Sequence, residues 1–195
     1  VALGESVPEH IPSFRLGKGV PFTDERLYDY EHYPADLYVA PGAVTANRVA
    51  LNKWGAWVNA FGAREYGRPL FVAASADLAD STMISGFAKA YGDFAGYGWY
   101  ERAGSPEGVL LPQEITEFAN AGILAGLATV NFADDPEAAF DGFWGACSTY
   151  GSFSYLKYGP FRLFSQLAQD CQLKVGKVLW IAGRSEERRV GKECT

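Results

Sequence analysis

Three short segments of the chain carry side chains that could do chemistry. The polar loop 75–82 contains Asp77 and Ser81, and it follows an apolar run that is typical of a buried strand. Glu117 precedes a run rich in alanine and glycine, and the segment 150–158 is dense in aromatic residues. In open α/β sheets ligands gather at the carboxyl ends of strands, so the polar loop is a candidate binding loop.

Each segment also has a purely structural explanation. A polar turn commonly follows a strand, and an acidic residue in the first turn of a helix is an ordinary partner of the helix dipole. Aromatic residues at this density usually belong to a core. Taken one at a time, the residue types therefore leave both a structural and a functional role open for each segment.

The apolar spacing predicts the elements that must position these segments. They are a helix over 44–62, a strand over 69–74, a long structured loop over 86–111, a helix opening at Pro112 and Glu114, a strand over 129–132, a helix over 160–170 and a strand over 175–182. Helices that alternate with buried strands predict an α/β fold, with a mostly parallel sheet and helices on both faces.

Composition limits the classes of function. The 195 residues suit one domain plus an arm, and the formal net charge of -6 comes with scattered basic residues, which argues against a nucleic-acid surface. No run of about 18 apolar residues predicts a membrane span. Three cysteines without metal-ligand spacing and two histidines, His10 and His32, argue against a metal site and a histidine acid–base site. We expect Cys147 and Cys171 to be reduced core residues of a cytoplasmic protein.

The two ends of the chain differ from its middle. Residues 1–42 are rich in proline, glycine, tyrosine and charged residues without a clear period, which predicts an extended arm or interdomain linker that packs through its aromatics. Residues 184–195 have no apolar period and resemble the translation of a sequencing-library adapter. We therefore expect one domain over 43–183, cut from a longer protein and followed by an artefact.

In their order along the chain, these features resemble the transketolase family. The loop Ser75-Ala76-Asp77-Leu78, the pair Glu117-Phe118 before a helix of small residues, and the aromatic segment match its central pyrimidine-binding domain over about residues 44–183. The resemblance implies an enzyme that uses thiamine diphosphate to move a two-carbon ketol unit between sugar phosphates. It also implies a homodimer, because the family binds its cofactor between subunits, and Mg²⁺ ligands in an N-terminal domain absent from this chain.

The resemblance assigns the cofactor contacts. Glu117 matches the catalytic glutamate that hydrogen-bonds N1′ of the cofactor's aminopyrimidine. Phe153 matches an aromatic residue that packs against that ring, with Tyr150, Tyr155 and Tyr158 as competitors.

The resemblance also assigns the substrate contacts. Arg48 and Ser81 match residues that hold the substrate phosphate, for which a planar guanidinium is well suited. Asp77 matches a loop residue that shapes the cofactor site. The stretch between Ser81 and Glu117 is longer than in ordinary transketolases, which leaves the acceptor sugar open.

The alternatives to a transketolase are a 2-oxo-acid dehydrogenase component, a deoxyxylulose-phosphate synthase, or a non-catalytic interaction domain in which Glu117 only caps a helix.

Overall fold

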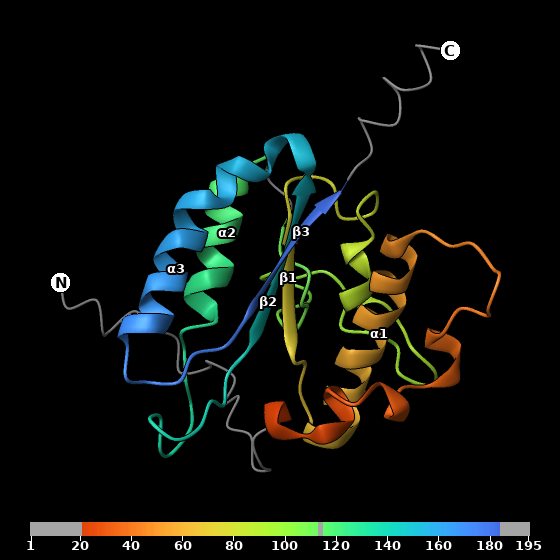
Figure 1. Ribbon diagram of the computed structural model, residues 1–195, viewed down its shortest axis with the longest axis horizontal. Helices are drawn as coiled ribbons and strands as arrows, with labels where there is room; N and C mark the ends of the chain where they lie inside the picture. Colours follow the sequence, from red (N-terminus) through yellow and green to blue (C-terminus); the bar gives the residue numbers. More distant parts are fainter. Residues whose placement is uncertain (1–20, 113–114, 184–195) are drawn as a thin grey trace.

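A parallel sheet forms the centre of the protein. The computed structural model describes residues 21–112 and 115–183. Its strands are β1 (Phe71–Ser75), β2 (Trp144–Tyr150) and β3 (Val178–Gly183), in the order β1-β2-β3 and all parallel. Consequently all three strands end at the same edge of the sheet (Figure 1), which we call the carboxyl edge.

Helices cover both faces of this sheet. Figure 1 shows α1 (Asn47–Tyr66) on one face, and α2 (Glu117–Leu127) with α3 (Tyr158–Asp170) on the other. Parallel neighbours need crossover connections, and α2 and α3 are the helices of the two crossovers. The predicted α/β class, with a parallel sheet and helices on both faces, is confirmed.

The larger core lies between α1 and the sheet. It contains Trp57 and Phe61 of α1, Phe71 of β1 and Phe87 of the following 3-10 turn (Ile84–Ala88). Asn59 is buried among them, and its amide group bonds the main-chain N–H groups of Leu70 and Phe71 and the carbonyls of Phe71 and Phe87. Because a buried amide must be satisfied, this side chain fixes α1 to the start of β1.

Residues 21–42 pack against this core in short 3-10 turns. The turns are Pro21–Thr23, Glu25–Leu27, Tyr30–His32 and Ala35–Leu37. Phe22 stacks on Trp144 of β2 with ring centroids 4.0 Å apart, and Tyr33 packs on Trp57 at 4.7 Å. This part of the predicted arm therefore contributes directly to the hydrophobic core.

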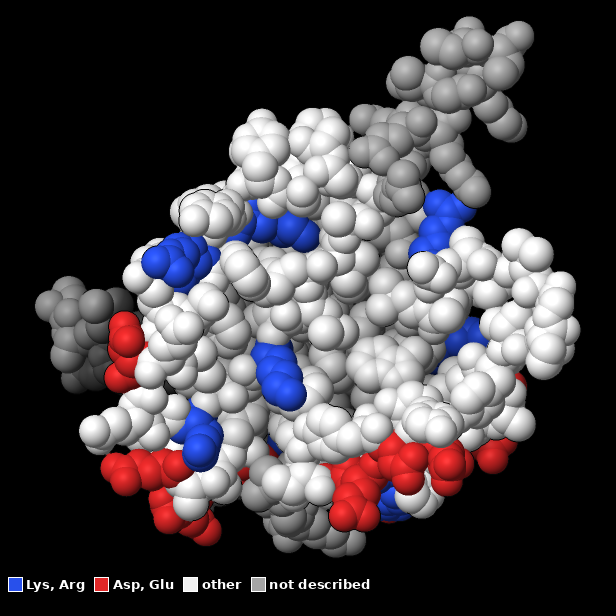
Figure 2. All heavy atoms as spheres, in the orientation of Figure 1, with Lys and Arg blue, Asp and Glu red and all other residues white. Residues whose placement is uncertain are grey.

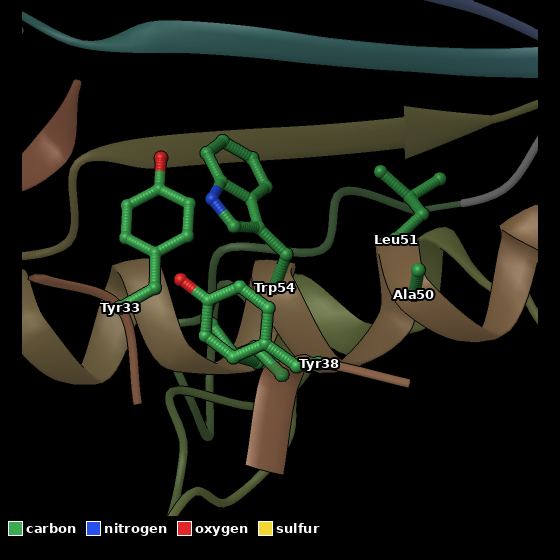
Figure 3. A pocket seen from close by; sticks show the side chains of 6 residues that line it. Tyr33, Tyr38, Ala50, Leu51 and Trp54 are labelled. Atoms are coloured by element: carbon green, nitrogen blue, oxygen red, sulfur yellow. The ribbon is translucent and has the colours of Figure 1, made fainter. Parts of the chain in front are cut away.

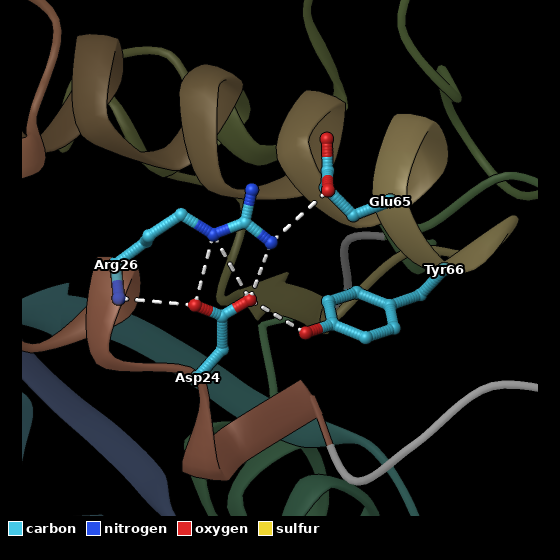
Figure 4. A network of polar contacts seen from close by, with 4 residues as sticks. All are labelled: Asp24, Arg26, Glu65 and Tyr66. Carbon is cyan, nitrogen blue, oxygen red and sulfur yellow. Dashed lines mark hydrogen bonds and ion pairs between the residues drawn. The ribbon is translucent and has the colours of Figure 1, made fainter.

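A polar network holds the same segment to the end of α1 (Figure 4). Asp24 accepts hydrogen bonds from the Arg26 guanidinium and from the Tyr66 hydroxyl, both at 2.7 Å, and Arg26 also pairs with Glu65 at 3.0 Å. The Arg26 contact lowers the pKa of Asp24 to about 2, while burial and the Asp24 contact raise the pKa of Tyr66 to about 12. Asp24 is therefore ionised at neutral pH, and it links the turn that contains Arg26 to the C-terminal end of α1.

One predicted element is wrong, and another begins later than expected. The strand expected over 129–132 is absent from this described stretch, where the Asn131 side chain bonds main-chain groups of its own loop, including Ala139 O at 2.8 Å. The strand is instead β2, whose glycine, alanine, cysteine, serine and threonine residues give no run of large apolar side chains. The helix expected from Pro112 begins at Glu117, and Glu114 lies outside the described residues.

The remaining predicted elements are confirmed with shifted ends. Helix α1, helix α3 and strands β1 and β3 lie where the apolar spacing placed them. The long loop is ordered and pairs with β1, since Ala73 N bonds Val109 O at 2.8 Å and Leu111 N bonds Ala73 O at 2.9 Å. The first part of the expected arm, residues 1–20, and the expected artefact, residues 184–195, lie outside the described residues.

Candidate functional site

The predicted site residues gather at the carboxyl edge of the sheet. This edge is formed by the loop 76–83 after β1, the end of β2, the 3-10 turn η7 (Gly151–Lys157) and the first turn of α2. Helix α2 connects β1 to β2 and runs antiparallel to both strands, so it begins at this edge (Figure 1). The topology therefore brings together segments that are far apart in the sequence.

Glu117 is a buried carboxylate at this edge. It is the first residue of α2, it is only 7% exposed, and its Oε1 accepts a hydrogen bond of 3.0 Å from the Thr149 hydroxyl of β2. A carboxylate at a helix N-terminus is favoured by the helix dipole, which offsets part of the cost of burial. The bond to Thr149 fixes the orientation of the carboxyl group.

On the opposite face of β2 a chain of buried hydroxyl groups fixes the loop after β1. Ser148 Oγ lies 2.9 Å from Ser75 Oγ and 2.8 Å from Thr82 Oγ1, and Thr82 donates to Leu78 O at 2.7 Å. Successive residues of a strand face opposite sides, so Ser148 holds this loop while Thr149 holds Glu117. Asp77 is exposed in this loop with a left-handed φ of 56°, which aspartate tolerates better than most residues.

Arg48 and Ser81, the predicted phosphate ligands, lie next to each other. Arg48 Nη1, from the first turn of α1, donates to Ser81 O at 3.1 Å. The Tyr150 hydroxyl, from the end of β2, donates to Ser81 Oγ at 3.0 Å. Arg48 and Ser81 are exposed, so this cluster lies on the surface of the protein.

The aromatic segment after β2 is exposed, contrary to the expectation that aromatics at this density belong to the core. Phe153 is 41% exposed, Tyr155 69% and Tyr158 64%, and Phe118 in the first turn of α2 is 61% exposed. Phe118 lies against Gly159 at the start of α3, where a side chain would come within 2.9 Å of its ring. Large exposed rings therefore lie on η7, at the start of α3 and in the first turn of α2.

Sequence reasoning missed one neighbouring titratable group, Lys157, and placed the other, Cys147, correctly in the core as a free thiol. Lys157 is 4% exposed, and its Nζ donates to the carbonyls of Cys147 and Ile181, each at 3.3 Å. Burial lowers the pKa of Lys157 and raises the pKa of the Cys147 thiol to about 11. Cys147 is therefore a thiol at neutral pH and a poor nucleophile.

Thr149 was missed as well, because its hydrogen bond to Glu117 forms only when β2 and α2 are brought together. The sequence offered no signal for Lys157 either, because a lysine beside tyrosines is usually a surface residue.

The hollow shown in Figure 3 lies elsewhere, between residues 33–38 and α1. It measures about 380 Å³ and is lined by Tyr33, Leu37, Tyr38, Ala50, Leu51 and Trp54. The lining is mostly apolar and includes none of the predicted site residues. We therefore place the candidate site at the carboxyl edge, where the polar groups converge.

The charges on one face of the molecule are distributed unevenly. Figure 2 shows most acidic side chains of this face along its lower border, while the upper border is mostly uncharged and its visible charged side chains are lysine or arginine. The upper border is the side on which the strands end (Figure 1). Within the described residues no group of three or more His, Cys, Asp or Glu side chains could hold a metal ion.

Comparison of the chain with protein-family models, with curated proteins and with solved structures found no match. Among the described helices, none has the length and apolar character needed to cross a membrane.

Proposed function

We propose that this chain is the pyrimidine-binding part of a transketolase-type enzyme that depends on thiamine diphosphate. In this proposal the complete enzyme breaks a carbon–carbon bond of a ketose phosphate and joins the released two-carbon ketol unit to the aldehyde carbon of an aldose phosphate. The observation that carries the proposal is the placement of Glu117, a buried and oriented carboxyl group at the carboxyl edge of a parallel sheet.

The residues present fit the pyrimidine half of this cofactor. An aminopyrimidine needs a carboxyl partner for its ring nitrogen and apolar surfaces for its two faces. Glu117 supplies the first, and the exposed ring of Phe153 on η7 supplies one surface, with Tyr155 and Tyr158 nearby in the sequence. The bound cofactor would supply a nucleophilic carbon and an electron sink.

Glu117 has the central role in this proposal. Its carboxyl group holds a proton against N1′ of the aminopyrimidine, and the Thr149 hydroxyl keeps that carboxyl in one orientation. A positioned acid or base of this kind contributes about 10²–10⁴-fold to a rate. The aromatic residues of η7 bind the ring and exclude water from the carboxyl group.

Arg48, Ser81 and Asp77 complete the proposed site. The exposed guanidinium of Arg48 and the Ser81 hydroxyl bind the phosphate of the sugar, while Asp77 shapes the loop beside the cofactor. The Mg²⁺ ion and the diphosphate are held by another domain, and the complete enzyme is a homodimer with shared sites. Exposed apolar side chains on α2 and α3, including Phe118, Phe161 and Leu163, are consistent with such a contact surface.

The test is Glu117→Gln in the complete protein that contains this chain. Glutamine keeps the shape and can still accept the Thr149 hydrogen bond, so we expect the fold to lose about 1 kcal/mol at most. The titratable proton is lost, so kcat should fall by roughly 10²–10⁴-fold. Proton–deuterium exchange at C2 of the bound cofactor measures the role directly, beside a melting curve.

The competing interpretation is that Glu117 only stabilises the contact between α2 and β2. A matched control is Glu137→Gln, which changes an exposed glutamate before β2 and should leave exchange and kcat unchanged. Wild-type exchange in the Glu117→Gln protein would return Glu117 to a structural role and remove the main support for the proposed function.

A further inference from the structure

Tyr150 connects the end of β2 to the loop after β1 through Ser81. Its hydroxyl donates to Ser81 Oγ at 3.0 Å, while the Arg48 guanidinium donates to the carbonyl of the same residue at 3.1 Å. Ser81 is thus contacted by side chains from β2 and from α1. This contact differs from the role of ring surface that the resemblance offers for Tyr150.

The position of the Tyr150 ring follows from its neighbours. Thr149 faces α2, so the next residue of the strand points to the face covered by α1. The ring lies against Gly183 at the end of β3, where a Cβ atom would stand 3.2 Å from Tyr150 Cδ1 and 3.4 Å from Thr82 Cγ2. The absence of a side chain at Gly183 gives the ring room to reach Ser81.

The hydrogen bonds around Ser81 have a defined direction. A serine hydroxyl has one proton and two acceptor lone pairs, and the tyrosine hydroxyl occupies one of these lone pairs. The Ser81 proton is directed to Leu78 O at 3.2 Å, which is long for a bond between two oxygens. An anionic oxygen would be a stronger acceptor for this proton, and the exposed Arg48 supplies positive charge beside it.

We infer that Tyr150 is a positioning residue that orients the Ser81 hydroxyl as a donor to the anionic end of a phosphorylated substrate. The inference rests on the proposed function for the identity of the substrate, a sugar phosphate. It adds a residue that determines the preference for phosphorylated sugars and that acts through Ser81.

The experiment compares Tyr150→Phe, Ser81→Ala and the double variant in the complete protein. Calorimetry measures the binding of fructose 6-phosphate and of fructose, and steady-state kinetics measures KM and kcat with both sugars. Tyr150→Phe removes one partly exposed hydroxyl, so the melting temperature should stay near the wild-type value. We expect Kd and KM for the phosphorylated sugar to rise about fivefold, as for one lost neutral hydrogen bond, with kcat and fructose binding unchanged.

The double variant separates positioning from direct contact. If Tyr150 acts through Ser81, adding Tyr150→Phe to Ser81→Ala causes no further loss, because the group to be oriented is already gone. Additive losses, or equal losses for both sugars, overturn the inference. Tyr30→Phe is the control, since this exposed tyrosine lies outside the segments that form the carboxyl edge and should leave both sugars unaffected.

The inference and the proposed function fail in different ways. Binding of the phosphorylated sugar that depends on Tyr150, in a protein without turnover, supports the inference and contradicts the proposed function. If turnover depends on Glu117 but Tyr150→Phe does not change the binding of the sugar phosphate, the proposed function is supported and the inference is overturned.

Discussion

Lys157 is a buried cation whose hydrogen-bond acceptors are neutral. Its Nζ contacts the carbonyls of Cys147 on β2 and Ile181 on β3, and it lies 5.9 Å from the centre of the Trp180 ring. None of the ion pairs formed among the described residues includes Lys157. Carbonyl oxygens and an aromatic face satisfy its N–H groups, but they compensate for burial of the charge less well than a carboxylate.

This arrangement predicts how stability depends on pH. Burial lowers the pKa of Lys157 below the usual 10.5, so the folded chain releases this proton before the unfolded chain does. Where the unfolded state binds more protons, stability rises with pH. We therefore expect the free energy of unfolding of the wild type, relative to Lys157→Met, to increase as the pH is raised toward 10.5.

Urea unfolding of both proteins at several pH values measures this difference. Groups that titrate in this range far from Lys157 contribute equally to the two proteins and cancel, while the Cys147 thiol, whose pKa Lys157 influences, is removed by Cys147→Ala in both proteins. A difference that stays constant or falls with rising pH would show that burial does not destabilise the charged form of Lys157.

At the residue scale, the sequence identified side chains through their motifs and missed those that need tertiary contacts. Glu117, Arg48 and Ser81 were selected by their sequence context, and the structure places them at one edge of the sheet. Thr149 and Lys157 became visible only when β2, α2 and η7 were brought together. Their roles depend on the alternation of β2 and on the carbonyls of neighbouring strands, which no local pattern encodes.

At the element scale, the size of the side chains decided which strands were predicted correctly from the sequence. Strands β1 and β3 contain large apolar residues and were found, whereas β2 contains small residues and was not. Small residues suit β2 because it lies in the middle of the sheet, and at Gly145 the chain approaches Leu124 of α2 so closely that a Cβ would lie 3.1 Å away. The close approach of α2, which requires small side chains on β2, thus weakened the sequence signal for the central strand.

Glycine positions in two elements give a matched pair of stability predictions. At Gly86 a Cβ would lie 2.2 Å from the carbonyl oxygen of Asn52, so Gly86→Ala forces the turn Ile84–Ala88 away from α1 and should cost roughly 1–3 kcal/mol. At Gly122 in α2 no atom lies within 4 Å, so Gly122→Ala should stabilise the helix by about 0.5–1 kcal/mol.

Urea unfolding curves measure both changes, and circular dichroism confirms that the helices remain. The contact of Gly86 is with rigid helix backbone, which leaves little freedom for relaxation. A stabilising Gly86→Ala would show that the turn and α1 do not pack as closely as the structure indicates. A destabilising Gly122→Ala would mean that the exposed side of α2 is in contact with another part of the protein.

At the scale of the whole molecule, the candidate site is open on one side. Glu117 and Lys157 are buried, yet the rings of Phe153, Tyr155 and Tyr158 on η7 and at the start of α3 are exposed. Exposed aromatic rings gathered in one segment are typical of a surface that a ligand or a second domain covers. The proposed function supplies both, a cofactor and the diphosphate-binding domain of another subunit.

This geometry predicts weak binding of thiamine diphosphate by the chain on its own. The described residues offer a carboxyl group and aromatic surfaces for the pyrimidine, but no group of three or more acidic, histidine or cysteine side chains for a metal ion. Most of the affinity for a diphosphate comes from charge and metal coordination, which this part of the enzyme does not supply in the proposal. Calorimetry with thiamine diphosphate and Mg²⁺ should therefore show little heat for the isolated chain and clear binding for the complete protein. As a control, Glu117→Gln in the complete protein should lower activity far more than cofactor affinity.

Micromolar binding by the isolated chain would contradict the shared site, because the pyrimidine half would then be sufficient to bind the cofactor.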